Sequence, residues 1–320
     1  MSVTNVIKQV PTPIAGLALG IASLGGIIDG RFTFDGQLAL VTASISALLL
    51  LALALKFALA PKLLKADLAH AVVGSVLPTA AMALMLIAAT VKPLLPGVTQ
   101  VLWPLAVLLH LLLLASFVFH RVREPIWSHM VPSWFVPPVG IIVAAVSCPS
   151  PEYAGIATAL LYFGMVAFAI LLPAMLYRLI FHPNIAEAAK PTIAILAAPA
   201  SLSMVGYLKM VQQPSAIVLM LLFGVALLMT MVVYGAFFHL LKLKFSPAYA
   251  AFTFPLVISS AALYQFALAT EKWGLAMHQQ LHAMADIELA IATLAVSYVA
   301  LHYVNAYRPG RSGASSTSYD

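Results

Sequence analysis

Apolar residues occur along this chain in long runs, which short polar connections separate. A helix needs about 20 mostly apolar residues to cross the hydrocarbon core of a bilayer. Ten runs meet or approach this length, and the fifth is the shortest: 12–28, 37–59, 70–91, 98–119, 134–148, 154–180, 191–210, 214–240, 247–270 and 283–304. The pattern therefore predicts an all-α integral membrane protein with ten transmembrane helices.

The composition excludes a soluble globular protein. Hydrophobic residues make up 63% of the 320 positions and charged residues only 8%, whereas a soluble domain is about 25% charged. The first residues, MSVTNVIKQV, lack the pattern of a cleavable signal peptide. We expect one transmembrane domain over residues 1–306 and a polar, disordered cytoplasmic tail over 307–320. Cys148 is the single cysteine, which excludes an intrachain disulfide and a cysteine-based metal cluster.

The distribution of lysine and arginine predicts the orientation, because cytoplasmic loops carry an excess of these residues. One side of the predicted topology holds 12 of the 16: Lys8, Lys56, Lys62, Lys65, Arg121, Arg123, Arg178, Lys190, Lys242, Lys244, Arg308 and Arg311. The other side holds Arg31, Lys92, Lys209 and Lys272. We therefore expect both termini in the cytoplasm and an even number of helices. The net charge of +6 reflects this topology and does not indicate nucleic-acid binding.

Prolines recur in alternate apolar runs. Pro13, Pro78, Pro137, Pro199 and Pro255 lie in runs one, three, five, seven and nine, 56 to 65 residues apart. A repeat of this kind indicates a structural unit used several times, here a helical hairpin used five times. The even runs are dense in aliphatic residues, with Pro104 and Pro173 as exceptions. The pattern predicts five inner, proline-kinked helices around a central pore, ringed by five outer helices. The alternative is that membrane helices simply carry more proline than soluble ones, but it does not explain the alternation.

The inner runs carry almost no ionisable residues, which favours anions over cations as the transported species. Cation pathways usually present rings of Asp or Glu, and Asp286 and Glu288 are expected only near the start of the tenth helix. Hydroxyl groups could line the pore and donate hydrogen bonds to an anion; the candidates are Thr79, Ser201, Ser203 and Thr253. Hydroxyls in membrane helices also bond to their own helix, so both interpretations stay open.

Three stretches resemble a known family. They are PTPIAGLALGIASLG (11–25), KPTIAILAAPASLSMVGYL (190–208) and FSPAYAAFTFPLVISS (245–260), and they resemble the tellurite-resistance/dicarboxylate transporter family. That family includes bacterial tellurite-resistance proteins, yeast malate permeases and plant slow-type anion channels. The resemblance implies a barrel of five hairpins, often a homotrimer, with a pore through each protomer that a phenylalanine on the ninth helix closes. The matching residue is Phe254, directly before Pro255, whereas Phe252 points elsewhere on the helix and is expected to pack.

Other functions remain as alternatives. The family also contains carriers, so a proton-coupled carrier of dicarboxylates such as malate, or of tellurite or sulfite, competes with a channel. No titratable group is evident in the predicted pathway, which favours passive conduction. A membrane redox enzyme could use His110, His239 and His302, but paired haem ligation needs histidines that face each other. His278 and His282 lie on one helix face, although two ligands do not make a metal site.

The sequence thus predicts a transporter or channel and not an enzyme, with no cofactor and no bound metal. The expected partners are small anions or dicarboxylates and the lipid bilayer, together with two further copies in a homotrimer by resemblance. The expected location is the plasma membrane of a bacterial or archaeal cell.

Overall fold

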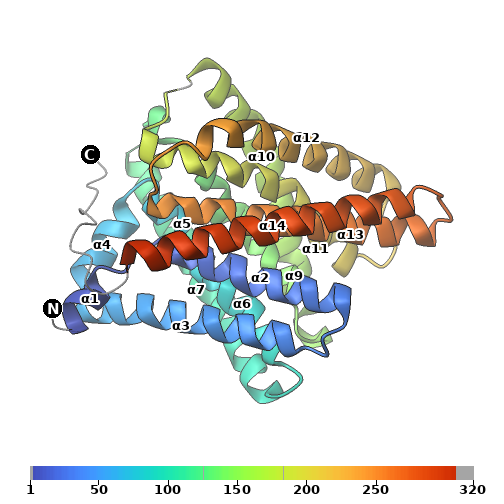
Figure 1. Ribbon diagram of the computed structural model, residues 1–320, viewed down its shortest axis with the longest axis horizontal. Coiled ribbons are helices and arrows are strands. Elements are labelled where there is room, and N and C mark those ends of the chain that lie inside the picture. The colour runs from blue at the N-terminus through green and yellow to red at the C-terminus, as the bar shows by residue number, and fades with distance from the viewer. Residues whose placement is uncertain (1–2, 125, 183, 308–320) are drawn as a thin grey trace.

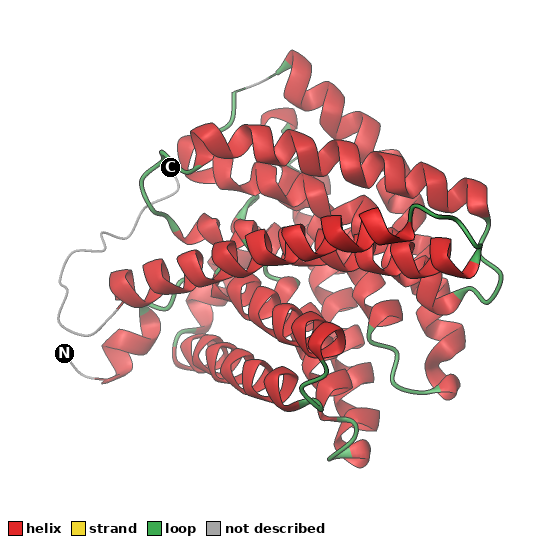
Figure 2. Cartoon of the chain, turned by 45° about the vertical axis from the view of Figure 1, so that its right-hand side comes forward, coloured by secondary structure: helices red, strands yellow, loops and turns green. Residues whose placement is uncertain are grey.

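The computed structural model describes residues 3–124, 126–182 and 184–307, and within these residues the chain consists of helices joined by loops and turns, with no strand (Figures 1 and 2). The predicted tail lies outside the described residues from position 308 onwards. Nine helical segments of the described part are long and apolar enough to cross a membrane. A tenth apolar segment, Pro132–Val146, is shorter. The all-helical membrane fold is therefore confirmed, and the count of ten spans stays a prediction.

The spans contain one or more helices each. Five are single α-helices that match the even-numbered predicted runs: α3 (Gln37–Leu59), α7 (Pro96–Arg123), α10 (Ala154–Phe181), α12 (Ala216–Leu240) and α14 (His278–Tyr307). The others are α2 (Ile14–Phe32), α5 (Val73–Val76) with α6 (Thr79–Val91), η5 (Glu187–Ala197) with α11 (Ala198–Met210), and η6 (Pro247–Phe252) with α13 (Phe254–Lys272), where η denotes a 3-10 helix. The short fifth segment contains η2 (Pro132–Phe135), α8 (Val136–Val139), η3 (Gly140–Ile142) and α9 (Val143–Val146). Shorter elements connect them: α1 (Val3–Lys8), α4 (Pro61–Ala69), η1 (Trp127–His129) and η4 (Pro151–Tyr153).

Burial separates the spans into two sets. The long odd-numbered spans are 56–78% buried over their most apolar stretch, whereas the even-numbered spans are only 22–33% buried. Lipid can solvate the exposed aliphatic faces of the second set, because leucine and lipid tails are equally apolar. The odd spans are therefore an inner layer and the even spans an outer layer, as the alternation of prolines predicts.

The inner prolines mark helix starts and not bends within continuous helices, which corrects the predicted kinks. Pro13 and Pro78 occupy the N-cap positions of α2 and α6, and Pro199 and Pro255 lie in the first turns of α11 and α13. Pro137 lies in the first turn of α8. Proline is tolerated at the start of a helix, because the N–H that it lacks has no intrahelical partner there. Four of the five inner spans are thus divided into more than one helix, and only the first, α2, is continuous.

Neighbouring spans pack side by side. In Figure 1, α2 lies along α3 and α13 lies along α14, and both pairs make extensive contacts, as do α6 and α7. The start of α1 and the end of α14 lie at the same end of the molecule in both views. This agrees with an even number of crossings. Which end faces the cytoplasm stays a prediction.

Three basic residues of the orientation argument are buried in outer helices, where they bond to backbone or hydroxyl oxygens. The ammonium of Lys56 donates to the Thr12 hydroxyl at 2.8 Å. Arg121 donates to the carbonyl of Ala69, and Arg178 donates to backbone carbonyls around η1. These side chains therefore fasten one end of the bundle, in addition to carrying charge.

Candidate functional site

A central cavity of about 70 Å³ lies between the inner spans. Every inner span contributes to its wall, and no outer span does. The lining residues are Pro13, Gly16, Leu19, Val72, Val73, Val76, Thr79, Met82, Phe135, Val136, Val139, Gly140, Thr192, Ile195, Ala198, Pro199, Leu202, Ala248, Ala250, Ala251, Phe254 and Pro255. In each span these residues belong to the N-terminal part. The cavity therefore occupies one half of the inner layer, and Phe254 is part of its wall.

The two phenylalanines of the ninth span have different surroundings. Phe254 is the first residue of α13 and lines the central cavity. Phe252, at the end of η6, is absent from the lining and packs edge-on against Phe237 of α12, with the ring centres 5.2 Å apart. A helix break at Thr253 separates them. Phe254 thus has access to the cavity, whereas Phe252 belongs to the packing between the inner and outer layers.

The other predicted pore residues divide into two groups. Four of the remaining candidates line the cavity: Pro13, Thr79, Pro199 and Pro255. Five do not: Pro78, Pro137, Ser201, Ser203 and Thr253. These five lie on the same inner spans but are absent from the cavity wall.

The predicted hydroxyl donors are already occupied. Thr79 donates to the carbonyl of Val76 at 2.6 Å, and Ser201 and Ser203 donate to carbonyls one turn earlier in their own segment. Thr253 donates to the carbonyls of Ala250 and Gly16. The hydroxyls therefore donate to backbone carbonyls and not into the cavity. This is the second of the two interpretations that the sequence left open.

The interrupted inner spans instead direct helix starts towards the cavity. The α-helices α2, α6, α11 and α13 begin at Ile14, Thr79, Ala198 and Phe254, within or next to the lining. The N-terminus of an α-helix carries the positive end of its dipole and favours negative charge. Short-range backbone bonds already satisfy several first-turn N–H groups, for example from Ile14 to the carbonyl of Pro11. An anion in the cavity would be attracted by the positive ends of these helix dipoles, although the wall is otherwise mainly apolar.

A second, wider cavity of about 550 Å³ lies at the end of the molecule that carries α4. Its wall contains basic and acidic groups, including Arg121, Glu124 and Glu187. It shares Val72 with the central cavity. The two cavities are therefore adjacent at Val72.

His110, considered above as a redox ligand, is a structural partner of the fifth inner segment. Its Nε2 lies 2.8 Å from the carbonyl oxygen of Pro137 and is fully buried. Because the carbonyl can only accept, Nε2 carries the proton and Nδ1 is left as an acceptor. The outer helix α7 thus supplies a donor to the interrupted backbone of α8. A lone histidine within a run of leucines was the signal in the sequence.

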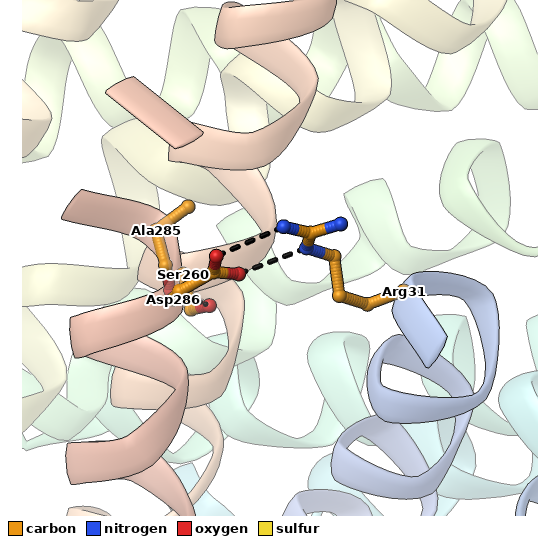
Figure 3. A network of polar contacts seen from close by, with 4 residues as sticks. All are labelled: Arg31, Ser260, Ala285 and Asp286. Carbon is orange, nitrogen blue, oxygen red and sulfur yellow. Dashed lines mark hydrogen bonds and ion pairs between the residues drawn. The ribbon is translucent and has the colours of Figure 1, made fainter. Parts of the chain in front are cut away.

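An ion pair fastens the opposite end of the bundle. Figure 3 shows Arg31 of α2 reaching Asp286 of α14, with two nitrogen–oxygen distances of 2.8 and 2.9 Å. Next to it, the hydroxyl of Ser260 on α13 donates to the carbonyl of Ala285 at 3.0 Å. The contacts join an inner span to the last outer helix. Asp286 is therefore occupied by a counter-charge and is not available as a pathway carboxylate.

Glu288 corrects the expectation for the tenth helix. Since α14 begins at His278 and not at 283, Glu288 is its eleventh residue and lies well inside the span. The residue is only 8% exposed, and Ser259 of α13 donates to its Oε2 at 2.7 Å. Sequence reasoning placed this titratable group near the end of the span because it set the start of the helix too late.

Comparison with known proteins agrees with this architecture. The family model described as "SLAC1: Voltage-dependent anion channel" matches residues 13–304. Two uncharacterized transporters of Methanocaldococcus jannaschii, MJ0762 and MJ0576, are 27% and 28% identical over 230 and 229 residues. These matches cover 64% and 62% of this chain, and 67% and 66% of the relatives. The predicted family is confirmed, and the matches indicate a transporter or channel and not an enzyme. The chain is a multi-pass membrane protein that belongs to the SLAC1 family of voltage-dependent anion channels.

Proposed function

We propose that this protein conducts small anions or C4-dicarboxylates passively through the central cavity, with Phe254 as the gate. The observation that carries the proposal is the wall of the cavity. All inner spans form it, and it contains no charged side chain among the described residues. In our proposal each protomer of a homotrimer in the plasma membrane has its own pore, and both termini are cytoplasmic.

The absence of acidic groups from the cavity wall supports anion selectivity. A cation that loses its water needs carboxylate or carbonyl oxygens in return, and the lining supplies mainly aliphatic carbon. The helix starts around the cavity contribute positive potential without a fixed charge. An anion would therefore be attracted weakly enough to leave again, as conduction requires.

The position of Phe254 supports its role as the gate. It lines the central cavity as the first residue of α13. An aromatic ring in a narrow passage blocks an ion by its volume, and an ion cannot shed its water against an apolar surface without a large cost. Conduction then requires the ring to move aside.

Anion flux in proteoliposomes tests the proposal, with Phe254→Ala compared against Phe252→Ala. The first substitution removes the plug and should raise chloride flux severalfold or more. The second removes a packed ring between η6 and α12 and should leave flux close to that of the wild type. An equal increase at both positions would indicate general loosening of the ninth span and would remove the gate assignment.

Reversal potentials in asymmetric potassium chloride test the selectivity. The wild-type potential should follow the chloride gradient, because no carboxylate lines the cavity. A potential that follows potassium would refute anion conduction.

A further inference from the structure

A polar chain crosses the apolar interface between the last three helices of the bundle. The hydroxyls of Thr230 on α12 and Ser259 on α13 are 2.9 Å apart, and Ser259 lies 2.7 Å from Oε2 of Glu288 on α14. Thr230, Ser259 and Glu288 are all buried. A hydroxyl both donates and accepts, so the same chain can serve a neutral or an ionised carboxyl group.

Glu288 has no cationic partner in the described part of the chain, where the ion pairs involve other residues. A small cavity of about 10 Å³ lies beside it, enclosed by Met204, Phe223, Ala226, Leu227, Ser259, Ala262 and Leu263. The wall is apolar apart from Ser259. An ionised carboxylate without a counter-charge is costly in such surroundings, so this arrangement fits the neutral acid.

Few other groups could neutralise an ionised Glu288 or donate a hydrogen bond to it. The titratable or charged groups on the helices around it are Asp29 and Arg31 on α2, Tyr207 and Lys209 on α11, Tyr234 and His239 on α12, Tyr264, Glu271 and Lys272 on α13, and His278, His282, Asp286, Tyr298, His302, Tyr303 and Tyr307 on α14. Arg31 and Asp286 neutralise each other, and none of these groups lines the small cavity. Tyr234 is different, because its buried hydroxyl has no hydrogen-bond partner among the described residues.

From this geometry we infer that Glu288, Ser259 and Thr230 form a proton-binding site within the membrane, which controls the position of α13. The inference rests on the proposed function, since α13 also begins with Phe254, five residues before Ser259. Loss of the proton leaves a charge that needs more donors or water than the closed packing supplies. The ionised protein therefore favours a rearranged α13, in which the Phe254 ring leaves the passage.

The proton site regulates the pathway and does not lie in it. Glu288 and Ser259 are absent from the lining of the central cavity, so the bound proton does not travel with the anion. A proton shifts the equilibrium between the two arrangements of α13 only as far as its affinities for them differ. If the pKa of Glu288 differs by one between the two arrangements, this equilibrium shifts about tenfold. We expect chloride flux to rise severalfold as pH is raised equally on both sides of the membrane.

The test measures chloride flux against pH in proteoliposomes for the wild type, Glu288→Gln, Ser259→Ala and Asp286→Asn. The glutamine variant stays neutral and should keep a low flux at every pH. Ser259→Ala removes a donor that stabilises the carboxylate, so its profile should move to higher pH. Asp286→Asn, the matched control on the same helix, should keep the wild-type pH dependence. A wild-type profile in Glu288→Gln, or an unshifted profile in Ser259→Ala, would overturn the inference.

Two further measurements separate this inference from the proposed function. Infrared titration of the wild type should show the carbonyl band of a neutral carboxylic acid that disappears as pH rises. Its absence overturns the proton site, whether or not anions are conducted. If the wild type shows no anion flux at any pH, the proposed function fails instead. Uphill chloride accumulation driven by a pH gradient and lost in Glu288→Gln would assign coupled transport and refute gating.

Discussion

Replacement of Gly20 by alanine should strain the junction that carries Phe254. A Cβ atom at this position of α2 would lie 2.5 Å from both Cβ and Oγ1 of Thr253, and 3.2 Å from the backbone nitrogen of Phe254. Ordinary contacts of a Cβ atom lie at 3.4–4 Å. Because the contact includes the Cβ of Thr253, rotation of its side chain cannot relieve it. The backbones of α2 and the η6–α13 junction must separate by about 1 Å.

The size of the effect follows from the cost of overpacking, about 1–3 kcal/mol. Alanine also gains up to about 1 kcal/mol over glycine in a helix, which would mask part of the loss. Gly26, on the same helix, supplies the correction, since a Cβ there meets nothing within 4 Å. The difference between Gly20→Ala and Gly26→Ala therefore isolates the contact. By the scaling of soluble proteins to 320 residues, it corresponds to roughly 2–4 °C in Tm.

Thermal unfolding in detergent, followed by the fraction of monodisperse protein, measures this difference, and chloride flux measures its effect on the gate. A double substitution makes the test specific. Thr253→Gly removes both crowded atoms, so Gly20→Ala should cost little when added to it. Equal Tm values for the two alanine variants, or a Gly20→Ala penalty that persists beside Thr253→Gly, would refute the reasoning.

Two other predictions concern the frame around the cavity. His110→Leu removes the donor to the Pro137 carbonyl and should lower the free energy of unfolding by about 1–3 kcal/mol, because a buried acceptor is left unsatisfied; an unchanged Tm would contradict this. In a chain without native cysteine, thiols introduced at Lys62 should be protected from impermeant reagents outside the cell and thiols at Lys272 should react, and the opposite result would invert the predicted orientation.

The division into inner and outer spans could be predicted because it depends on composition that repeats along the chain. Whether a proline bends a helix or begins one could not be predicted. A proline inside a helix and a proline in the first turn give the same local sequence, and only the backbone of the preceding residues separates them. The stretch around Pro255 illustrates the point, since η6 ends at Phe252 and α13 begins at Phe254. That break lets two phenylalanines two residues apart reach different layers.

The hydroxyl groups show a second limit of sequence reasoning. Ser201 and Ser203 follow Pro199 closely and were good candidates for the cavity wall by position. Each hydroxyl can donate its hydrogen bond either to a ligand or to a carbonyl one turn earlier in the helix. In the structure both hydroxyls donate to the carbonyl. The choice depends on the side-chain rotamer, which neither spacing nor composition determines.

Glu288 is the instructive case, because the sequence did contain a signal for it. The buried residues of α14 include Leu281, Ala285, Leu289, Ala292, Val296, Val299 and Tyr303. Their spacing of three and four residues traces one face of a helix, and Glu288 lies on that face, three residues after Ala285. A carboxyl group on the inward face of a membrane helix requires a partner or a proton. The partner is Ser259, five residues after Phe254 on α13. A polar residue that interrupts a buried stripe therefore carries more information about function than the uninterrupted apolar run, which indicates only that the helix crosses the membrane.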